Sequence, residues 1–96
     1  MIIDLVSFRV KPQRVQDFLR HNEEWVRLMR RARGFVNQTL FRNLDSPVEF
    51  VAQVGWVSRD YRDRFHSGDD ADRHALQEAA RELLEAAPTS TLIEGV

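Results

Sequence analysis

The stretch GWVSRDYRDRFHSGDDADRH, residues 55–74, decides the fold, because it runs from a strand end through a short helix and a break into another helix. Within it, Trp56, Phe65 and His74 follow one another at steps of nine residues. On one continuous α-helix, nine residues turn the face by about 180°, so Phe65 and His74 would point in opposite directions. We expect the break around Gly68 to bring both side chains to one pocket, with Trp56 in its floor.

Two helices are predicted on either side of this break. Ser58 belongs to a residue type that caps helix N-termini, and it predicts a short helix from Arg59 to about His66. Gly68 ends that helix, and we expect it to adopt a positive φ, which costs glycine little. An aspartate at position 69, 70 or 72 caps the next helix, and Pro88 ends it. The apolar stripe of this last helix comprises Leu76, Ala79, Ala80, Leu83, Leu84 and Ala87.

The rest of the chain supplies four strands and a long helix. Residues 2–10 form a β-rich run with apolar side chains in both phases, after which Pro12 opens an amphipathic helix that Gly34 ends. The order β-α-β-β-α-α-β predicts a ferredoxin-like α+β sandwich, in which helices cover one face of an antiparallel sheet. The helix stripe comprises Val15, Phe18, Leu19, Asn22, Val26 and Met29, and the further strands span 35–44, 48–56 and 89–96.

The sheet face away from the helices also carries apolar side chains. Depending on the phase of each strand, these are Ile3, Leu5, Val51 and Leu92. A stable monomer rarely leaves such a face in water. We therefore expect a homodimer with two-fold symmetry, in which two copies pack sheet to sheet.

The composition restricts the classes of function. The 96 residues suit a single domain over residues 1–96, and a formal net charge of -1 gives no basic field that attracts nucleic acid or a membrane. No cysteine is present, so thiolate catalysis and thiolate metal sites are excluded. No apolar run approaches the roughly 20 residues of a membrane span, and Asp4 interrupts the first one, so no signal segment is visible. We expect a cytoplasmic protein without nucleic-acid or membrane partners.

Four short segments carry a resemblance to a known family. They are FRVKP (residues 8–12), RGF (33–35), GWVSRDY (55–61) and LIEGV (92–96). In this order and spacing, the chain resembles the antibiotic biosynthesis monooxygenase superfamily of dimeric α+β barrels. The resemblance implies one of three kinds of protein: a small oxygenase that oxidises polycyclic phenols or quinols without metal or flavin, a haem-degrading enzyme, or a member without a known activity.

The haem-degrading branch of that superfamily gives the nine-residue steps a meaning. Its members carry a strand-end tryptophan, a pocket tryptophan and an axial histidine at similar intervals, and the resemblance matches Trp56 to the first and His74 to the third. Phe65 falls where the pocket tryptophan is expected, and Val6 or Ser7 falls where the branch has an asparagine. The chain thus keeps the histidine but neither the asparagine nor the pocket tryptophan.

The function predicted from these observations is cofactor-independent, monooxygenase-like oxidation of a small aromatic or quinol-type ligand. A haem-binding protein and a non-catalytic dimeric module remain alternatives, and so does a surface position for His74, which would lie about 160° from Leu76 on a helix that already runs at position 74. No metal site is predicted, because His74 and Glu78 lack a third ligand. Candidates for proton transfer or anion binding are His74, Tyr61 and His66, and candidates for the walls of the pocket are Trp56, Phe65, Val6 and Phe8.

Overall fold

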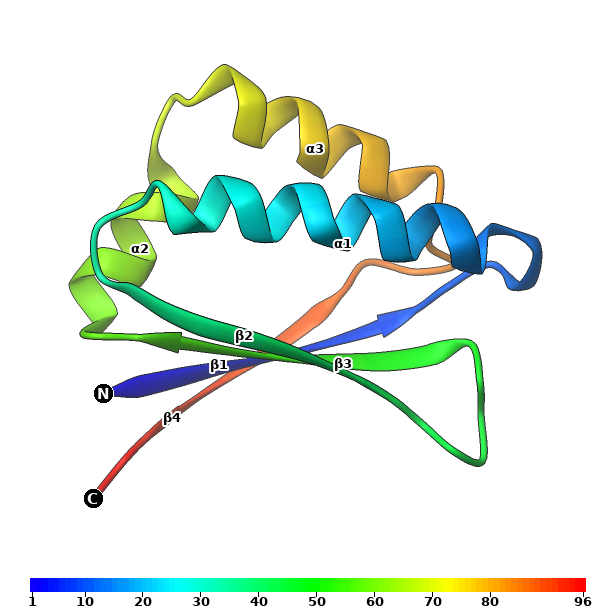
Figure 1. Ribbon diagram of the computed structural model, residues 1–96, viewed down its shortest axis with the longest axis horizontal. Coiled ribbons are helices and arrows are strands. Elements are labelled where there is room, and N and C mark those ends of the chain that lie inside the picture. Colours follow the sequence, from blue (N-terminus) through cyan, green and yellow to red (C-terminus); the bar gives the residue numbers. More distant parts are fainter.

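The computed structural model describes residues 1–96 as a four-stranded sheet with three α-helices on one face (Figure 1). This is the predicted α+β ferredoxin-like fold, in the predicted order. None of the helices has the length and apolar character that crossing a membrane requires. The elements are β1 (Ile2–Arg9), the 3-10 turn η1 (Pro12–Arg14), α1 (Val15–Arg30), β2 (Phe35–Arg42), β3 (Glu49–Trp56), α2 (Arg59–Ser67), α3 (Ala71–Arg81) and β4 (Thr89–Glu94).

The sheet has the strand order β2-β3-β1-β4, and all neighbouring strands run antiparallel. Helices α1 and α3 lie side by side above it, and α2 lies beyond the end of β3 (Figure 1). In the central pair, Ile2 stands opposite Trp56 and Phe8 opposite Phe50. Because opposite residues of antiparallel strands point to the same face, the even-numbered side chains of β1 and β3 all face the helices.

The core between sheet and helices has two parts. Near the start of β1, Trp56 is fully buried and packs with Ile2 and Met29. Near its end, Phe18 of α1 packs with Phe50 of β3, with ring centroids 5.0 Å apart. The two clusters hold α1 over the sheet at both ends and leave a space between them.

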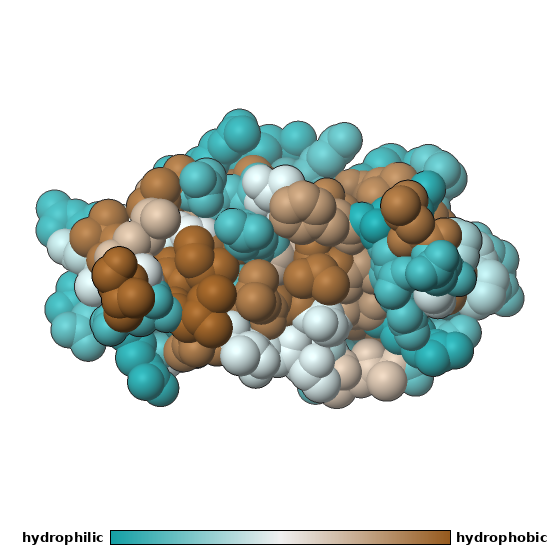
Figure 2. All heavy atoms as spheres, turned by 90° about the horizontal axis from the view of Figure 1, so that it is seen from below, coloured by the Kyte–Doolittle hydropathy of each residue, from teal (hydrophilic) through white to brown (hydrophobic).

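The opposite face of the sheet is open and rich in apolar side chains (Figure 2). One prediction for this face was wrong: Leu92 packs against the core on the helix side, and Ile93 takes its place on the open face. The reason is the register of β4, in which Ile93 stands opposite Ile3 and therefore shares its face. The apolar residues of the open face are Ile3, Leu5, Phe41, Val51 and Ile93.

The helix termini confirm some of the sequence predictions and correct others. Gly34 ends the segment after α1 with φ +83°, where only glycine is unstrained. Gly68 follows α2 but has φ −71° and ψ 165°, so the prediction of a positive φ was wrong: the chain leaves the helix directly into extended backbone. Asp70 caps α3 by accepting from the backbone N–H groups of the two residues that follow Ala71. Ser58 precedes α2, but its hydroxyl makes no capping bond.

Candidate functional site

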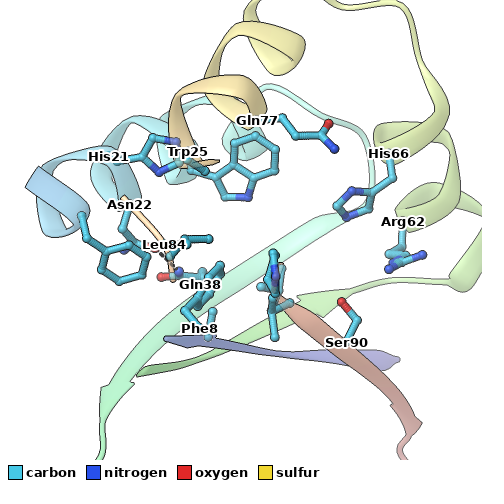
Figure 3. Close-up of a pocket in the computed structure, with 16 residues that line it drawn as sticks. Phe8, His21, Asn22, Trp25, Gln38, Arg62, His66, Gln77, Leu84 and Ser90 are labelled. Carbon is cyan, nitrogen blue, oxygen red and sulfur yellow. Dashed lines mark hydrogen bonds between the residues drawn. The ribbon is translucent and has the colours of Figure 1, made fainter. Parts of the chain in front are cut away.

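A cavity of about 240 Å³ lies between the sheet and the helix layer (Figure 3). Its walls are aromatic and aliphatic, with Phe8 from β1, Phe18 and Trp25 from α1 and Leu84 from the segment after α3. Phe8 and Phe18 are in contact, with ring centroids 5.2 Å apart. The polar side chains fall into two groups, which Figure 3 shows on opposite sides of the cavity: His21, Asn22 and Gln38 on one side, and Arg62, His66, Gln77 and Ser90 on the other.

The second group contains an ion pair anchored in the core. The Nε of Arg62 donates to Oδ2 of Asp4 at 3.0 Å, and its Nη1 donates to Oδ1 of Asp63 at 3.1 Å. Asp4 is 2% exposed, and its second oxygen, Oδ1, has no hydrogen-bond partner. The Nε2 of His66 lies 4.0 Å from the same Oδ2. A buried carboxylate therefore fixes the guanidinium of Arg62 at the cavity wall, beside an imidazole.

The surroundings of His66 keep its imidazole neutral. Burial lowers the pKa of His66, the positive charge of Arg62 lowers it further, and the negative charge of Asp4 opposes both effects only in part. For Arg62, burial works against the charged form, but the hydrogen bonds to Asp63 and Asp4 prevail and raise its pKa. At neutral pH this end of the cavity thus pairs a permanent cation with an uncharged base.

The first polar group is formed by amides and a histidine on α1 and β2. The Nε2 of Gln38 donates to Oδ1 of Asn22 at 2.7 Å. The Nε2 of His21 lies 2.7 Å from the carbonyl oxygen of Leu76, which can only accept, so Nε2 carries the proton. In the neutral ring, Nδ1 of His21 is then left as an acceptor. His21 also lies nearly parallel to the ring of Trp25.

Three of the residues predicted for the site, Val6, Phe8 and His66, line this cavity. The other aromatic candidates do not. Trp56 is fully buried in the core, and Phe65 packs between Trp25 and Trp56, with centroids 5.6 and 5.5 Å away. Tyr61 lies against Gly34, where a Cβ would come within 2.3 Å of its ring.

His74 lies outside the cavity, on the exposed side of α3. Its backbone N–H donates to the carbonyl of Asp70 at 3.1 Å, so the helix already runs at this position. The expectation that the break brings Phe65 and His74 into one pocket was therefore wrong, and the surface alternative for His74 is confirmed. The physical reason is that α3 starts at Ala71, which leaves His74 on the face away from Leu76.

The sequence gives only weak signals for the polar cavity residues that the predicted site does not include. Asn22 interrupts the apolar stripe of α1, and Asp4 interrupts an apolar strand; a polar residue on an otherwise apolar face is a sign of a site. Arg62 has no such signal, because α2 is charged on most sides. No three histidine, aspartate or glutamate side chains stand close enough together to hold a metal ion.

Comparisons with known proteins agree with this architecture. The sequence model of the antibiotic biosynthesis monooxygenase family matches residues 1–75. A protein from Bordetella bronchiseptica, assigned to the antibiotic biosynthesis monooxygenases, is 26% identical with a TM-score of 0.83, over 99% of this chain and 96% of that one. SnoaB from Streptomyces nogalater, a cofactor-independent oxygenase whose structure is that of a mutant, is 23% identical with a TM-score of 0.82, over 98% of this chain and 91% of that one. Among curated proteins, none matched the sequence.

Proposed function

The chain belongs to the antibiotic biosynthesis monooxygenase family, and on this premise we propose that it oxidises a small phenol or quinol with dioxygen in the cavity between sheet and helices. The observation that carries the proposal is the Arg62–His66 end of a cavity with aromatic and aliphatic walls, where Asp4 holds the cation in place. Such a site suits a phenol, because the walls pack against its ring and the cation favours the deprotonated form of its hydroxyl group. Solved relatives of similar structure include a cofactor-independent oxygenase, which supports this class of reaction.

The size of the cavity suits a ligand of one or two rings. Apolar cavities of about 150 Å³ already accommodate benzene, and this one measures about 240 Å³. Phe8, Phe18 and Trp25 provide the flat apolar surfaces against which a ring packs. The Asn22–Gln38 amide pair offers hydrogen bonds to a second oxygen on the far side of the ring.

In the proposed mechanism, the neutral imidazole of His66 accepts the phenolic proton and Arg62 stabilises the phenolate oxygen. The electron-rich anion passes one electron to dioxygen, and the two radicals combine to form a C–O bond at a ring carbon. The resulting peroxide takes up the proton from His66, and cleavage of its O–O bond leaves one oxygen on the ring as a carbonyl. The other oxygen departs as water together with the hydrogen lost from that carbon. The substrate supplies all the electrons; written for the keto tautomer of the phenol, the sum is R₂CH₂ + O₂ → R₂C=O + H₂O.

These roles have typical magnitudes. A positioned base contributes about 10²–10⁴-fold to a proton-transfer step, and one fixed donor at a developing oxyanion contributes about 10²–10³-fold. Both are larger where water is excluded from the reacting group. Of the residues predicted for chemistry, this mechanism uses His66. It gives Tyr61 and His74 no chemical step, because neither borders the cavity.

The proposed reaction uses no cofactor. The haem alternative predicted from the nine-residue steps relied on His74 as the axial ligand, and this residue is exposed and outside the cavity. The residues present therefore do not fit haem in that manner. A titration with haem tests the alternative directly, since binding shifts the Soret band.

We further propose that the protein is a homodimer whose copies meet through the open sheet face. Phe41, Val51 and Ile93 are 50%, 36% and 47% exposed there, and Figure 2 shows apolar residues gathered across this face. Burying such a surface against an identical copy removes its apolar side chains from water, which favours association. The cavity lies on the other side of the sheet, so each copy carries its own.

Oxygen uptake tests the proposed activity. With 1,4-dihydroxynaphthalene as substrate, the protein should accelerate uptake above auto-oxidation in buffer, and His66→Gln and Arg62→Gln should each lower kcat about 100-fold. Arg64→Gln is the matched control, because Arg64 lies on the same helix but over the ring of Tyr61, outside the cavity. No acceleration with any phenol or quinol would leave the non-catalytic dimeric module as the better description.

A further inference from the structure

Arg73 at the start of α3 is a buried cation without a carboxylate partner. The residue is 4% exposed. Its guanidinium donates to three neutral acceptors: the carbonyl of Gly68, Oε1 of Gln77 at 3.0 Å and Nε2 of His74 at 3.3 Å. Its Nε is buried and has no partner at all. Two of its five N–H groups are therefore unused.

Three carboxylates near Arg73 pair with other groups, and one of them, Glu78, lines the same groove as Arg73 and pairs with Arg81 at 3.5 Å. Asp70 accepts from the backbone N–H groups of Asp72 and Arg73 as the cap of α3, and Asp72 pairs with Arg31 on α1 at 3.4 Å. An unpaired buried charge is expensive, and buried charges in proteins are generally paired. The hydrogen bond to the Gly68 carbonyl uses one N–H group of Arg73, but this neutral acceptor does not balance the positive charge.

Arg73 does not line the cavity itself but lies in a groove that shares two residues with it. This groove is on the outside of α3, and His66 and Gln77 line both the groove and the cavity. Figure 3 shows these two side chains at the same end of the cavity. The positive charge of Arg73 also reaches His66, where it contributes to lowering the pKa of that imidazole. A ligand with its ring in the cavity can thus extend an acidic group between His66 and Gln77.

We propose that Arg73 is the specificity determinant for an aromatic carboxylate, whose ring occupies the cavity and whose acid group lies at the His66–Gln77 end and neutralises the Arg73 charge. This inference deepens the proposed function, since it uses the same cavity and names the class of ligand. A carboxylate brings the single negative charge that the guanidinium lacks, and charge-assisted hydrogen bonds between these groups are among the strongest in proteins.

Two probes of nearly identical shape test this proposal: 2-naphthoate and the neutral 2-naphthamide. Neither has a phenolic hydroxyl, so binding is measured without turnover, by quenching of the fluorescence of Trp25 in the cavity wall. The protein should bind 2-naphthoate at least tenfold more tightly than 2-naphthamide, with a preference that shrinks as salt is added. Arg73→Gln should bind 2-naphthoate and 2-naphthamide about equally tightly, and its affinity for 2-naphthamide should equal that of the unmodified protein.

A further arginine variant assigns the effect to Arg73. Arg30→Gln removes the same charge from an exposed position on α1, outside the cavity, and should keep the preference. Equal binding of both probes by the unmodified protein overturns the inference, even if Arg73→Gln fails to fold. A preference that survives in folded Arg73→Gln overturns it as well. Absence of oxygen uptake refutes the proposed oxidation but not this binding preference.

Discussion

Replacing Asp4 by asparagine should destabilise the protein strongly, because Asp4 is the most deeply buried carboxylate and anchors Arg62. Breaking a buried ion pair costs about 3–5 kcal/mol. We expect the lower end, about 3 kcal/mol, because the Arg62 side chain is 20% exposed and keeps its bond to Asp63. With an m-value of about 2 kcal/mol/M for a small domain, the urea midpoint should fall by about 1.5 M. Unfolding is followed by the fluorescence of the buried Trp56.

Asp63→Asn is the matched control, since Asp63 is the other carboxylate on Arg62. Its side chain is 50% exposed, so its ion pair contributes less than about 1 kcal/mol. Replacing both Asp4 and Arg62 by leucine should recover most of the stability that Asp4→Asn loses, because an apolar pair leaves no unpaired charge. Equal midpoints for Asp4→Asn and Asp63→Asn would refute the argument that burial makes the Asp4 pair strong.

Three further predictions address the base, the turns and the dimer. Because burial lowers the pKa of His66, oxygen uptake should fall only below the ordinary histidine pKa of about 6.5, and His66→Gln should remove this step from the pH profile. By the same linkage, the contribution of His66 to stability is present above that pH and is lost on acidification. Gly34→Ala should cost at least about 2 kcal/mol in urea unfolding, because its φ is +83° and a Cβ meets the ring of Tyr61; Gly68→Ala, with φ −71°, should cost less than about 1 kcal/mol. Sedimentation equilibrium at micromolar concentration should give twice 11.3 kDa, and Val51→Lys should shift the protein toward the monomer.

The helices and strands could be predicted because each carries a clear period. The alternate residues Phe50, Ala52, Val54 and Trp56 of β3 are all buried, as the apolar alternation indicates. Strand β4 offers no such alternation. Leu92 and Ile93 are adjacent and both apolar, so only the pairing with β1 decides which of them faces the helices.

The amide side of the cavity depends on a feature that local pattern does not reveal. Gln38 faces the helices because the β2–β3 register shifts between Phe35 and Asn37. A bulge of this kind re-aims the side chains that follow it. Asn22 was recognised as part of the helix stripe, but its partner could not be predicted without that shift. The hydrogen bond between these two amides, which are 16 residues apart in the sequence, can therefore be identified only from the structure.

Tyr61 and Phe65 of α2 pack against the core and do not line the cavity, but they determine which side chains of this helix do. The helix carries two pairs of residues at i, i+4 spacing, and the second pair is offset from the first by one position. The first pair is Tyr61 with Phe65, and the second is Arg62 with His66. One residue turns the face by about 100°, so only one pair can pack against Trp56 and the turn after α1. The aromatic pair does so, because burying two rings releases more free energy than burying two polar groups. That choice turns Arg62 and His66 toward the cavity, and thus the apolar pair sets the orientation of the polar pair on which the proposed chemistry depends.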